Sequence, residues 1–193
     1  MTGLPMSVLL FSAVYVAGSV NFSILVFRIT GRDDPRHHGS GNPGATNVYR
    51  QAGIGWALMV LLLDIGRAVA VALVASTLLP LWQVPWIGFA LILGNRFPCF
   101  HGFKGGKGVA NYLGFTAVSA PAWAALGVLA WGAAHLMWRT PFLSSFAMVA
   151  VLAAGTAIVQ DGAWVGIFGV VLTAVFIAAC HHGNIRERWG GRR

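Results

Sequence analysis

The succession of long apolar segments, separated by short polar ones, restricts what this chain can fold into more than any other feature. A helix needs about 20 mostly apolar residues to cross the hydrocarbon core of a bilayer. These segments lack strand-like alternation, so they predict helices rather than a barrel. About seven transmembrane helices are expected, at residues 5–27, 54–79, 82–94, 109–120, 122–138, 141–159 and 163–180.

The composition agrees with an integral membrane protein. Of the 193 residues, 57% are hydrophobic and 9% are charged, and the mean hydropathy is +0.72. Soluble domains carry about 25% charged residues. We therefore expect a single polytopic, all-α membrane domain over residues 1–193. The formal net charge of +8 does not indicate nucleic-acid binding, because the basic residues sit in short clusters between apolar segments.

The uneven distribution of Lys and Arg predicts an orientation in the membrane. With seven spans, 12 of the 13 Lys and Arg residues fall on one side, and the other one, Arg67, lies within the second span. Short basic loops face the cytoplasm, so the N-terminus is expected outside and the C-terminus inside. Asp64 and Arg67 are three residues apart on one helix face, and we expect a structural ion pair in preference to a direct substrate contact.

A glycine-rich polar loop, GSGNPGATNVYR at residues 39–50, has the character of a phosphate cradle. Three glycines in six residues let successive N–H groups turn toward an anion, and short polar side chains add donors. Arg50 contributes a planar, permanently charged fork suited to phosphate. The alternative is an ordinary surface turn before a helix. The residues expected to bind phosphate here are Ser40, Gly41, Asn42, Gly44, Ala45, Thr46 and Asn47.

Two further segments repeat this chemistry. The sequence FKGGKG at residues 103–108 combines glycines with cations, and the tail carries His181 and Asn184. The predicted topology brings all three segments to the cytoplasmic surface, where they would form one basic pocket beside the lipid. Gly105 and Gly106 are expected to join in phosphate binding.

Other kinds of site receive less support. The sequence has no nucleophile-elbow spacing, no nucleotide-binding P-loop order and no zinc-ligand spacing among its histidines and cysteines. We therefore expect no metal and no cofactor. Two alternatives stay open, namely a membrane transporter or flippase for an organic phosphate or anionic lipid, and a scaffold role. The sequence carries no signal for the oligomeric state.

The motif at residues 39–50, with FP at 97–98 and FKGGKGVA at 103–110, resembles the acyl-phosphate-dependent glycerol-3-phosphate acyltransferases of bacteria, the PlsY family. The resemblance implies seven spans in the bacterial cytoplasmic (inner) membrane and an active site on the cytoplasmic face. It implies transfer of a fatty acyl group from acyl phosphate to glycerol 3-phosphate, giving lysophosphatidic acid (1-acylglycerol 3-phosphate) and phosphate in phospholipid biosynthesis. The chain departs from the family pattern at two places. Asn95 replaces a usual His, and the Glu that usually closes the third motif, which here starts with His181 and Asn184, is missing around residues 189–192.

The resemblance also implies roles for these residues. The loop from Ser40 to Asn47 would hold the phosphate of the acyl donor. The expected catalytic residues are Arg50, Lys104, Lys107, His181 and Asn184, which would bind glycerol 3-phosphate and neutralise charge as phosphate leaves. No covalent enzyme intermediate is required, because acyl phosphate has a good leaving group, and a substrate phosphate would accept the hydroxyl proton. Asp33 and Asp34 are expected to be solvated loop acids.

Overall fold

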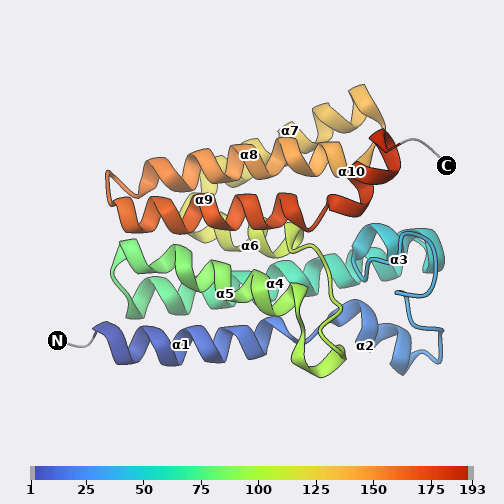
Figure 1. Ribbon diagram of the computed structural model, residues 1–193, viewed down its shortest axis with the longest axis horizontal. Helices are drawn as coiled ribbons and strands as arrows, with labels where there is room; N and C mark the ends of the chain where they lie inside the picture. The colour runs from blue at the N-terminus through green and yellow to red at the C-terminus, as the bar shows by residue number, and fades with distance from the viewer. Residues whose placement is uncertain (1–2, 191–193) are drawn as a thin grey trace.

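The computed structural model describes residues 3–190, and within that range every regular element is a helix (Figure 1). Gly191 and Arg192, at the end of the third motif, lie outside the described residues. Across the described residues the helices are, in chain order, α1 (Gly3–Gly18), α2 (Phe22–Ile29), α3 (Ala45–Ala52), α4 (Ile54–Leu78), η1 (Leu81–Gln83), α5 (Val84–Arg96), η2 (Cys99–His101), α6 (Val109–Ser119), α7 (Pro121–Trp138), α8 (Pro141–Val159), α9 (Trp164–Ala179) and α10 (His182–Trp189).

The seven apolar segments are all helical, but the first is not one helix as predicted. It breaks after Gly18, and α2 starts at Phe22. The side chain of Asn21 accepts a hydrogen bond from the N–H of Ile24 at 3.1 Å and so caps the new helix. An asparagine in this position satisfies one of the free N–H groups at a helix start, which favours a new helix over continuation of the old one.

The exterior of the bundle is apolar. Leu9, Leu62, Leu129 and Phe168 project from four different long helices, and each is more than half exposed. Within residues 3–190, three stretches are long and apolar enough to cross a membrane, at Met6–Ile29, Ile54–Leu78 and Pro141–Val159. A fourth is added if α9 and α10, which are bent by 48°, count as one span. These are the properties of an integral membrane protein.

The long helices run back and forth through the bundle. In Figure 1, α1, α5, α7 and α9 run toward one end, and α4, α6 and α8 return. This arrangement gathers α2, α3, α10 and the segment 97–108 at the end opposite the N-terminus (Figure 1). The three polar motifs of the sequence therefore lie at the same end of the molecule.

Close packing of α1 against α5 fixes the position of one of these motifs. Gly94 lies so near α1 that a Cβ there would overlap the carbonyl oxygen of Tyr15, and Gly18 meets the backbone of Leu91 in the same way. Small residues of this kind let two helices approach closely. The hydroxyl of Tyr15 also donates a hydrogen bond to the carbonyl of Phe97 at 2.7 Å. The C-terminal end of α5, from which the chain leads to the second glycine motif at residues 103–108, is thus fixed to α1.

We expect Gly94→Val to destabilise the bundle, because the added side chain meets backbone that cannot move aside. Overpacking of this kind costs about 1–3 kcal/mol. The measurement is the apparent melting temperature of purified protein in detergent. Gly132→Ala is the control, since a Cβ at Gly132 meets nothing within 4 Å. Equal melting of Gly94→Val and wild type would contradict the close contact.

Candidate active site

The first glycine motif folds around the side chain of Asn47, which is 1% exposed. Its Oδ1 accepts a hydrogen bond from the N–H of Ser40 at 3.1 Å, and its Nδ2 donates to the carbonyls of Pro35 at 2.9 Å and His38 at 3.1 Å. Gly39, with φ of 61°, adopts the left-handed conformation that this turn requires. Asn47 therefore shapes the loop from inside, and its contact with a phosphate stays a prediction.

The second half of this motif is helical, so the prediction of a polar loop as far as Arg50 is wrong. Helix α3 starts at Ala45, directly after the N-cap residue Gly44. The reason is its two-sided pattern: Asn47 and Val48 are buried on one side, whereas Thr46 and Arg50 are exposed. Ser40 and Gly41 are exposed in the preceding loop, and Asn42 and Ala45 are half-buried.

The second glycine motif is folded back onto the end of α5. The N–H of Gly105 donates to the carbonyl of Arg96 at 3.0 Å, and the N–H of Gly106 donates to the carbonyl of Asn95 at 2.9 Å. Both glycines are buried, and a Cβ on Gly105 would overlap the Asn95 carbonyl oxygen and lie 2.6 Å from Pro98 Cδ. These N–H groups are used inside the protein, so the glycines shape the loop, and their predicted contact with phosphate stays untested.

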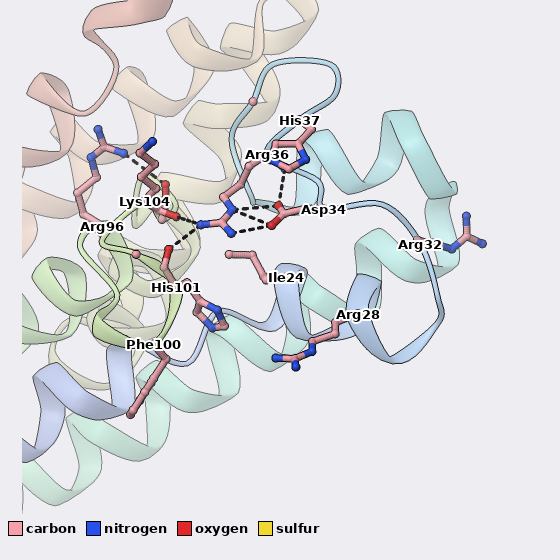
Figure 2. A pocket seen from close by; sticks show the side chains of 13 residues that line it. Ile24, Arg28, Arg32, Asp34, Arg36, His37, Arg96, Phe100, His101 and Lys104 are labelled. Carbon is pink, nitrogen blue, oxygen red and sulfur yellow. Dashed lines mark hydrogen bonds and ion pairs between the residues drawn. The ribbon is translucent and has the colours of Figure 1, made fainter.

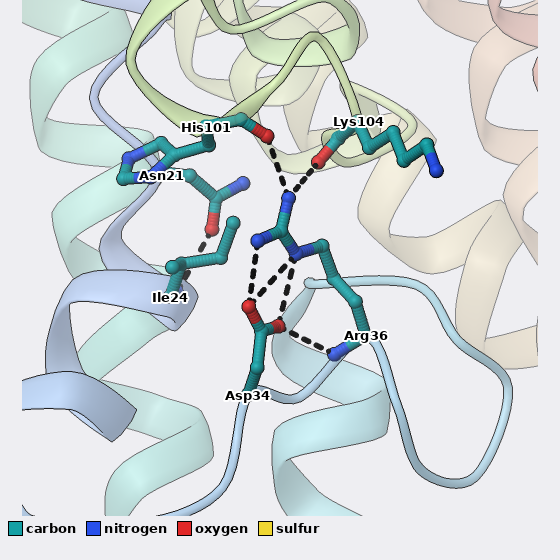
Figure 3. Close-up of polar contacts among 6 residues, drawn as sticks. All are labelled: Asn21, Ile24, Asp34, Arg36, His101 and Lys104. Carbon is teal, nitrogen blue, oxygen red and sulfur yellow. Dashed lines mark hydrogen bonds and ion pairs between the residues drawn. The ribbon is translucent and has the colours of Figure 1, made fainter.

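Arg36, just before the first glycine motif, links the loop that carries this motif to the second glycine motif, as Figure 3 shows. Its Nη2 forms an ion pair with Asp34 at 2.6 Å, and its Nη1 donates to the carbonyls of His101 at 2.6 Å and Lys104 at 3.1 Å. Hydrogen bonds from Arg36 lower the pKa of Asp34. The expectation that Asp34 is a solvated loop acid is therefore wrong: its carboxylate is partly buried and orients the arginine that holds the loops together.

A cationic cavity of about 900 Å³ lies between these loops and α2 (Figure 2). Of the described residues that line it, Asp34 alone carries a carboxylate. The pKa of His101 is lowered, first by burial and then by the charge of Arg36, which favours the neutral imidazole. The lining side chains that carry a fixed positive charge are Arg28, Arg32, Arg36, Arg96 and Lys104. Such a cavity suits a small, multiply charged anion.

A second polar cluster connects the second glycine motif to the tail. Lys107 Nζ donates a hydrogen bond to Asn184 Oδ1 in α10. His181 is 2% exposed, and its Nδ1 lies 2.8 Å from the carbonyl of Ile177, so Nδ1 carries the ring proton. Burial lowers the pKa of His181 to about 4 and also lowers the pKa of Lys107. His181 is therefore neutral at pH 7 with an unprotonated Nε2, which fits a binding role better than that of a strong base.

Arg96 connects the cavity and this second cluster. It lines the cavity, donates to the carbonyl of Gly105 at 3.3 Å, and its charge depresses the pKa of Lys107, as does that of Arg50. Of the residues predicted for the site, the structure places Gly41, Lys104 and Gly105 on the cavity wall.

Sequence reasoning missed the other cations of the cavity. The arginines of residues 28–36 were used only to orient the chain in the membrane. Their spacing of four, at Arg28, Arg32 and Arg36, was the available signal.

The sequence profile of the glycerol-3-phosphate acyltransferase family matches residues 8–191. The chain belongs to this family. A glycerol-3-phosphate acyltransferase of Pseudomonas syringae pv. syringae is 37% identical over 188 residues, which is 95% of each chain. One from Pseudomonas aeruginosa strain PAO1 is 36% identical over 179 residues, covering 92% of this chain and 93% of the relative.

Solved structures of the same family share the fold. The crystal structure of PlsY (YgiH), an integral membrane glycerol 3-phosphate acyltransferase, in its glycerol 3-phosphate form has a TM-score of 0.88 and 31% identity, and the match covers 97% of this chain and 94% of that one. Its lysophosphatidic acid form has a TM-score of 0.86 and 30% identity. This member of the glycerol-3-phosphate acyltransferase family thus keeps the family fold along nearly its whole length.

Proposed function

We propose that this protein transfers a fatty acyl group from acyl phosphate to glycerol 3-phosphate, forming lysophosphatidic acid and phosphate in phospholipid biosynthesis. The observation that carries the proposal is the cationic cavity between the two glycine motifs, in a member of the glycerol-3-phosphate acyltransferase family. Both substrates carry a phosphate, and the acyl chain of one belongs in lipid. A cation-lined cavity at one end of an apolar helical bundle meets both requirements.

In the proposed reaction, a hydroxyl of glycerol 3-phosphate attacks the carbonyl carbon of the acyl phosphate. The new ester bond forms as the bond between that carbon and the phosphate oxygen breaks, and the hydroxyl proton passes to a substrate phosphate. Fixed cations that hold two anions together reduce their repulsion and stabilise the charge on the departing phosphate. Neither a covalent enzyme intermediate nor a cofactor enters this reaction.

We assign the residues as follows. Lys104 holds the phosphate of glycerol 3-phosphate on the cavity wall, together with the arginines that line the cavity. The loop from Ser40 to Thr46 holds the phosphate of the donor, and Arg50 binds glycerol 3-phosphate. Lys107 and Asn184, joined by their hydrogen bond, and neutral His181 bind the reacting groups between them.

The direct test is product formation by purified protein in detergent, with palmitoyl phosphate and radiolabelled glycerol 3-phosphate. We expect labelled lysophosphatidic acid and an equal amount of phosphate. Palmitoyl-CoA in place of palmitoyl phosphate serves as the control donor, and we expect it to give no product. Product from the thioester alone would contradict the assigned donor, and no product from either donor would contradict the proposed reaction.

We also propose a topology of seven spans in the bacterial inner membrane, with the N-terminus outside and the candidate site on the cytoplasmic face. Three observations support it: the helices alternate in direction, the three polar motifs gather at one end, and the Lys and Arg residues outside the spans that the structure describes cluster at that end. A single polytopic domain over residues 1–193 and contact of the site with membrane lipid belong to the same proposal.

Cysteine labelling in intact spheroplasts tests this topology. In a background that lacks Cys99 and Cys180, we expect a cysteine at Gly162 to react with a membrane-impermeant maleimide. A cysteine at Asp33 is expected to react only after the membrane is opened, because the basic loops lie inside. The reverse pattern of labelling would contradict the orientation and the cytoplasmic placement of the site.

A further inference from the structure

At the break between α1 and α2, a buried arginine of another helix donates a hydrogen bond to the carbonyl of Val20. Helix α1 ends at Gly18 and α2 starts at Phe22, and the turn between them pairs the carbonyl of Ala17 with the N–H of Val20 at 3.2 Å. Arg67, in the middle of α4, donates from Nη1 to the carbonyl of Val20 and, at 3.4 Å, to that of Ala17. An unpaired carbonyl inside an apolar bundle is costly, so the hydrogen bond from Arg67 to the Val20 carbonyl stabilises the break.

Arg67 is itself held from several sides. Its Nη2 donates to Asp64 Oδ1 at 2.9 Å and to Asn111 Oδ1 of α6 at 2.7 Å. The guanidinium also lies 4.9 Å from the ring centroid of Phe22, the first residue of α2. The Arg67 side chain is 9% exposed and that of Asp64 is 12% exposed. This pairing fixes the guanidinium between α4, α6 and the break, and it confirms the expected ion pair.

Asn21, the residue after Val20, connects the break to the candidate site. Asn21 caps α2 through Oδ1, and its Nδ2 donates to the carbonyl of Pro43, in the first glycine motif, at 3.4 Å. Helix α2 carries Ile24 and Arg28 into the cavity wall. Figure 3 shows Asn21 and Ile24 beside the Arg36 contacts that link the loop of the first glycine motif to the second motif.

We infer that Arg67 is a positioning residue for the candidate site: by holding the break between α1 and α2, it sets the place of the α2 wall of the cavity and of the first glycine motif. The inference rests on the proposed function only in assigning glycerol 3-phosphate to the cavity. Arg67 belongs to none of the three motifs, and it acts through Val20 and Asn21 rather than by touching the substrate.

Kinetics of three variants give the first arm of the test. Arg67→Met removes the guanidinium, the double variant Asp64→Asn/Arg67→Met also removes the orphaned carboxylate, and Arg67→Lys keeps the charge without the fork. In both Met variants we expect the KM for glycerol 3-phosphate to rise about tenfold with little change in kcat, the pattern of a disturbed binding wall. The KM of Arg67→Lys is expected to lie between that of the Met variants and that of wild type.

A matched control separates positioning from loss of stability. Thr173→Val removes a buried hydrogen bond within α9, from Thr173 Oγ1 to the carbonyl of Gly169 at 2.7 Å, far along the chain from the break. It is expected to lower the melting temperature without raising KM. Equal KM values in Thr173→Val and Asp64→Asn/Arg67→Met would overturn the positioning role.

A distance measurement gives the second arm and needs no activity. Spin labels at Ile29 on α2, 74% exposed, and Leu136 on α7, 82% exposed, report the placement of α2 in protein without Cys99 and Cys180. We expect Asp64→Asn/Arg67→Met to broaden or shift this distance distribution. The control pair, Leu136 with Leu62 on α4, is expected to stay unchanged.

The two arms separate the possible failures. A wild-type-like distribution between residues 29 and 136 in the double variant would overturn the positioning role of Arg67. An inactive wild-type protein would instead overturn the proposed function, and the distance arm would still decide whether Arg67 holds the break.

Discussion

Gly105→Val is expected to abolish acyl transfer while the helical bundle stays folded. Gly105 is buried where the second glycine motif turns back onto α5, and a Cβ would overlap the carbonyl oxygen of Asn95. The loop must therefore move away from α5. This displaces Lys104 from the cavity wall and Lys107 from its hydrogen bond with Asn184. The rate of lysophosphatidic acid formation measures the effect, and size-exclusion chromatography with melting shows that the fold persists.

The control for this variant is Gly55→Ala at the start of α4. A Cβ at Gly55 meets nothing within 4 Å, so this substitution is expected to leave activity and melting near wild type. If Gly105→Val turned over at the rate of Gly55→Ala, acyl transfer would not depend on the observed path of the second glycine motif.

Lys107→Met is expected to lower kcat/KM by about a hundredfold, as for loss of a charge-assisted hydrogen bond to an anion. Lys107 is half-buried and donates a hydrogen bond to Asn184. Burial, the charge of Arg96 and the charge of Arg50 lower its pKa. Methionine keeps most of the length of the side chain and removes the charge. The control is Arg188→Met, an exposed position on α10, and a defect of equal size in both variants would contradict a specific role for Lys107.

The pH dependence of the reaction provides an independent check on Lys107. Burial and the charge of Arg96 lower its pKa from the usual lysine value of 10.5. The ammonium form is present below that pKa and is lost as the pH rises through it. We therefore expect kcat/KM to fall at alkaline pH, starting below the range of an ordinary lysine, and this fall to be absent in Lys107→Met. His181, with a pKa of about 4, contributes no inflection between pH 6 and 8.

Apolar segments allowed most of the helices to be predicted, because burial in lipid demands a continuous run of apolar residues. The break at residues 19–21 was missed for the same reason. Ser19, Val20 and Asn21 interrupt the apolar pattern only slightly, and the Arg67 guanidinium that donates to the Val20 carbonyl at the break comes from another helix. A contact between residues 47 positions apart leaves no trace in a local pattern.

For the candidate site, the sequence indicated where cations and glycines occur but not how they are used. Lys104 lies on the cavity wall and Lys107 is hydrogen-bonded to Asn184, and their roles in catalysis stay predictions. Arg36 was missed as a connector, because its partners are backbone carbonyls of His101 and Lys104, which any residues could supply. The glycines were expected to offer free N–H groups, whereas Gly105 and Gly106 use theirs within the protein.

Equilibrium binding of glycerol 3-phosphate is the most direct test of the central claim that the cationic cavity holds its phosphate. We would titrate wild type and Lys104→Met calorimetrically in detergent, with uncharged glycerol as the control ligand and Arg139→Lys as the control variant. We expect wild type and Arg139→Lys to bind glycerol 3-phosphate equally and not to bind glycerol. Lys104→Met is expected to bind glycerol 3-phosphate at least about tenfold more weakly, because it loses a charge-assisted contact. Unchanged affinity in Lys104→Met would contradict the assignment of the cavity.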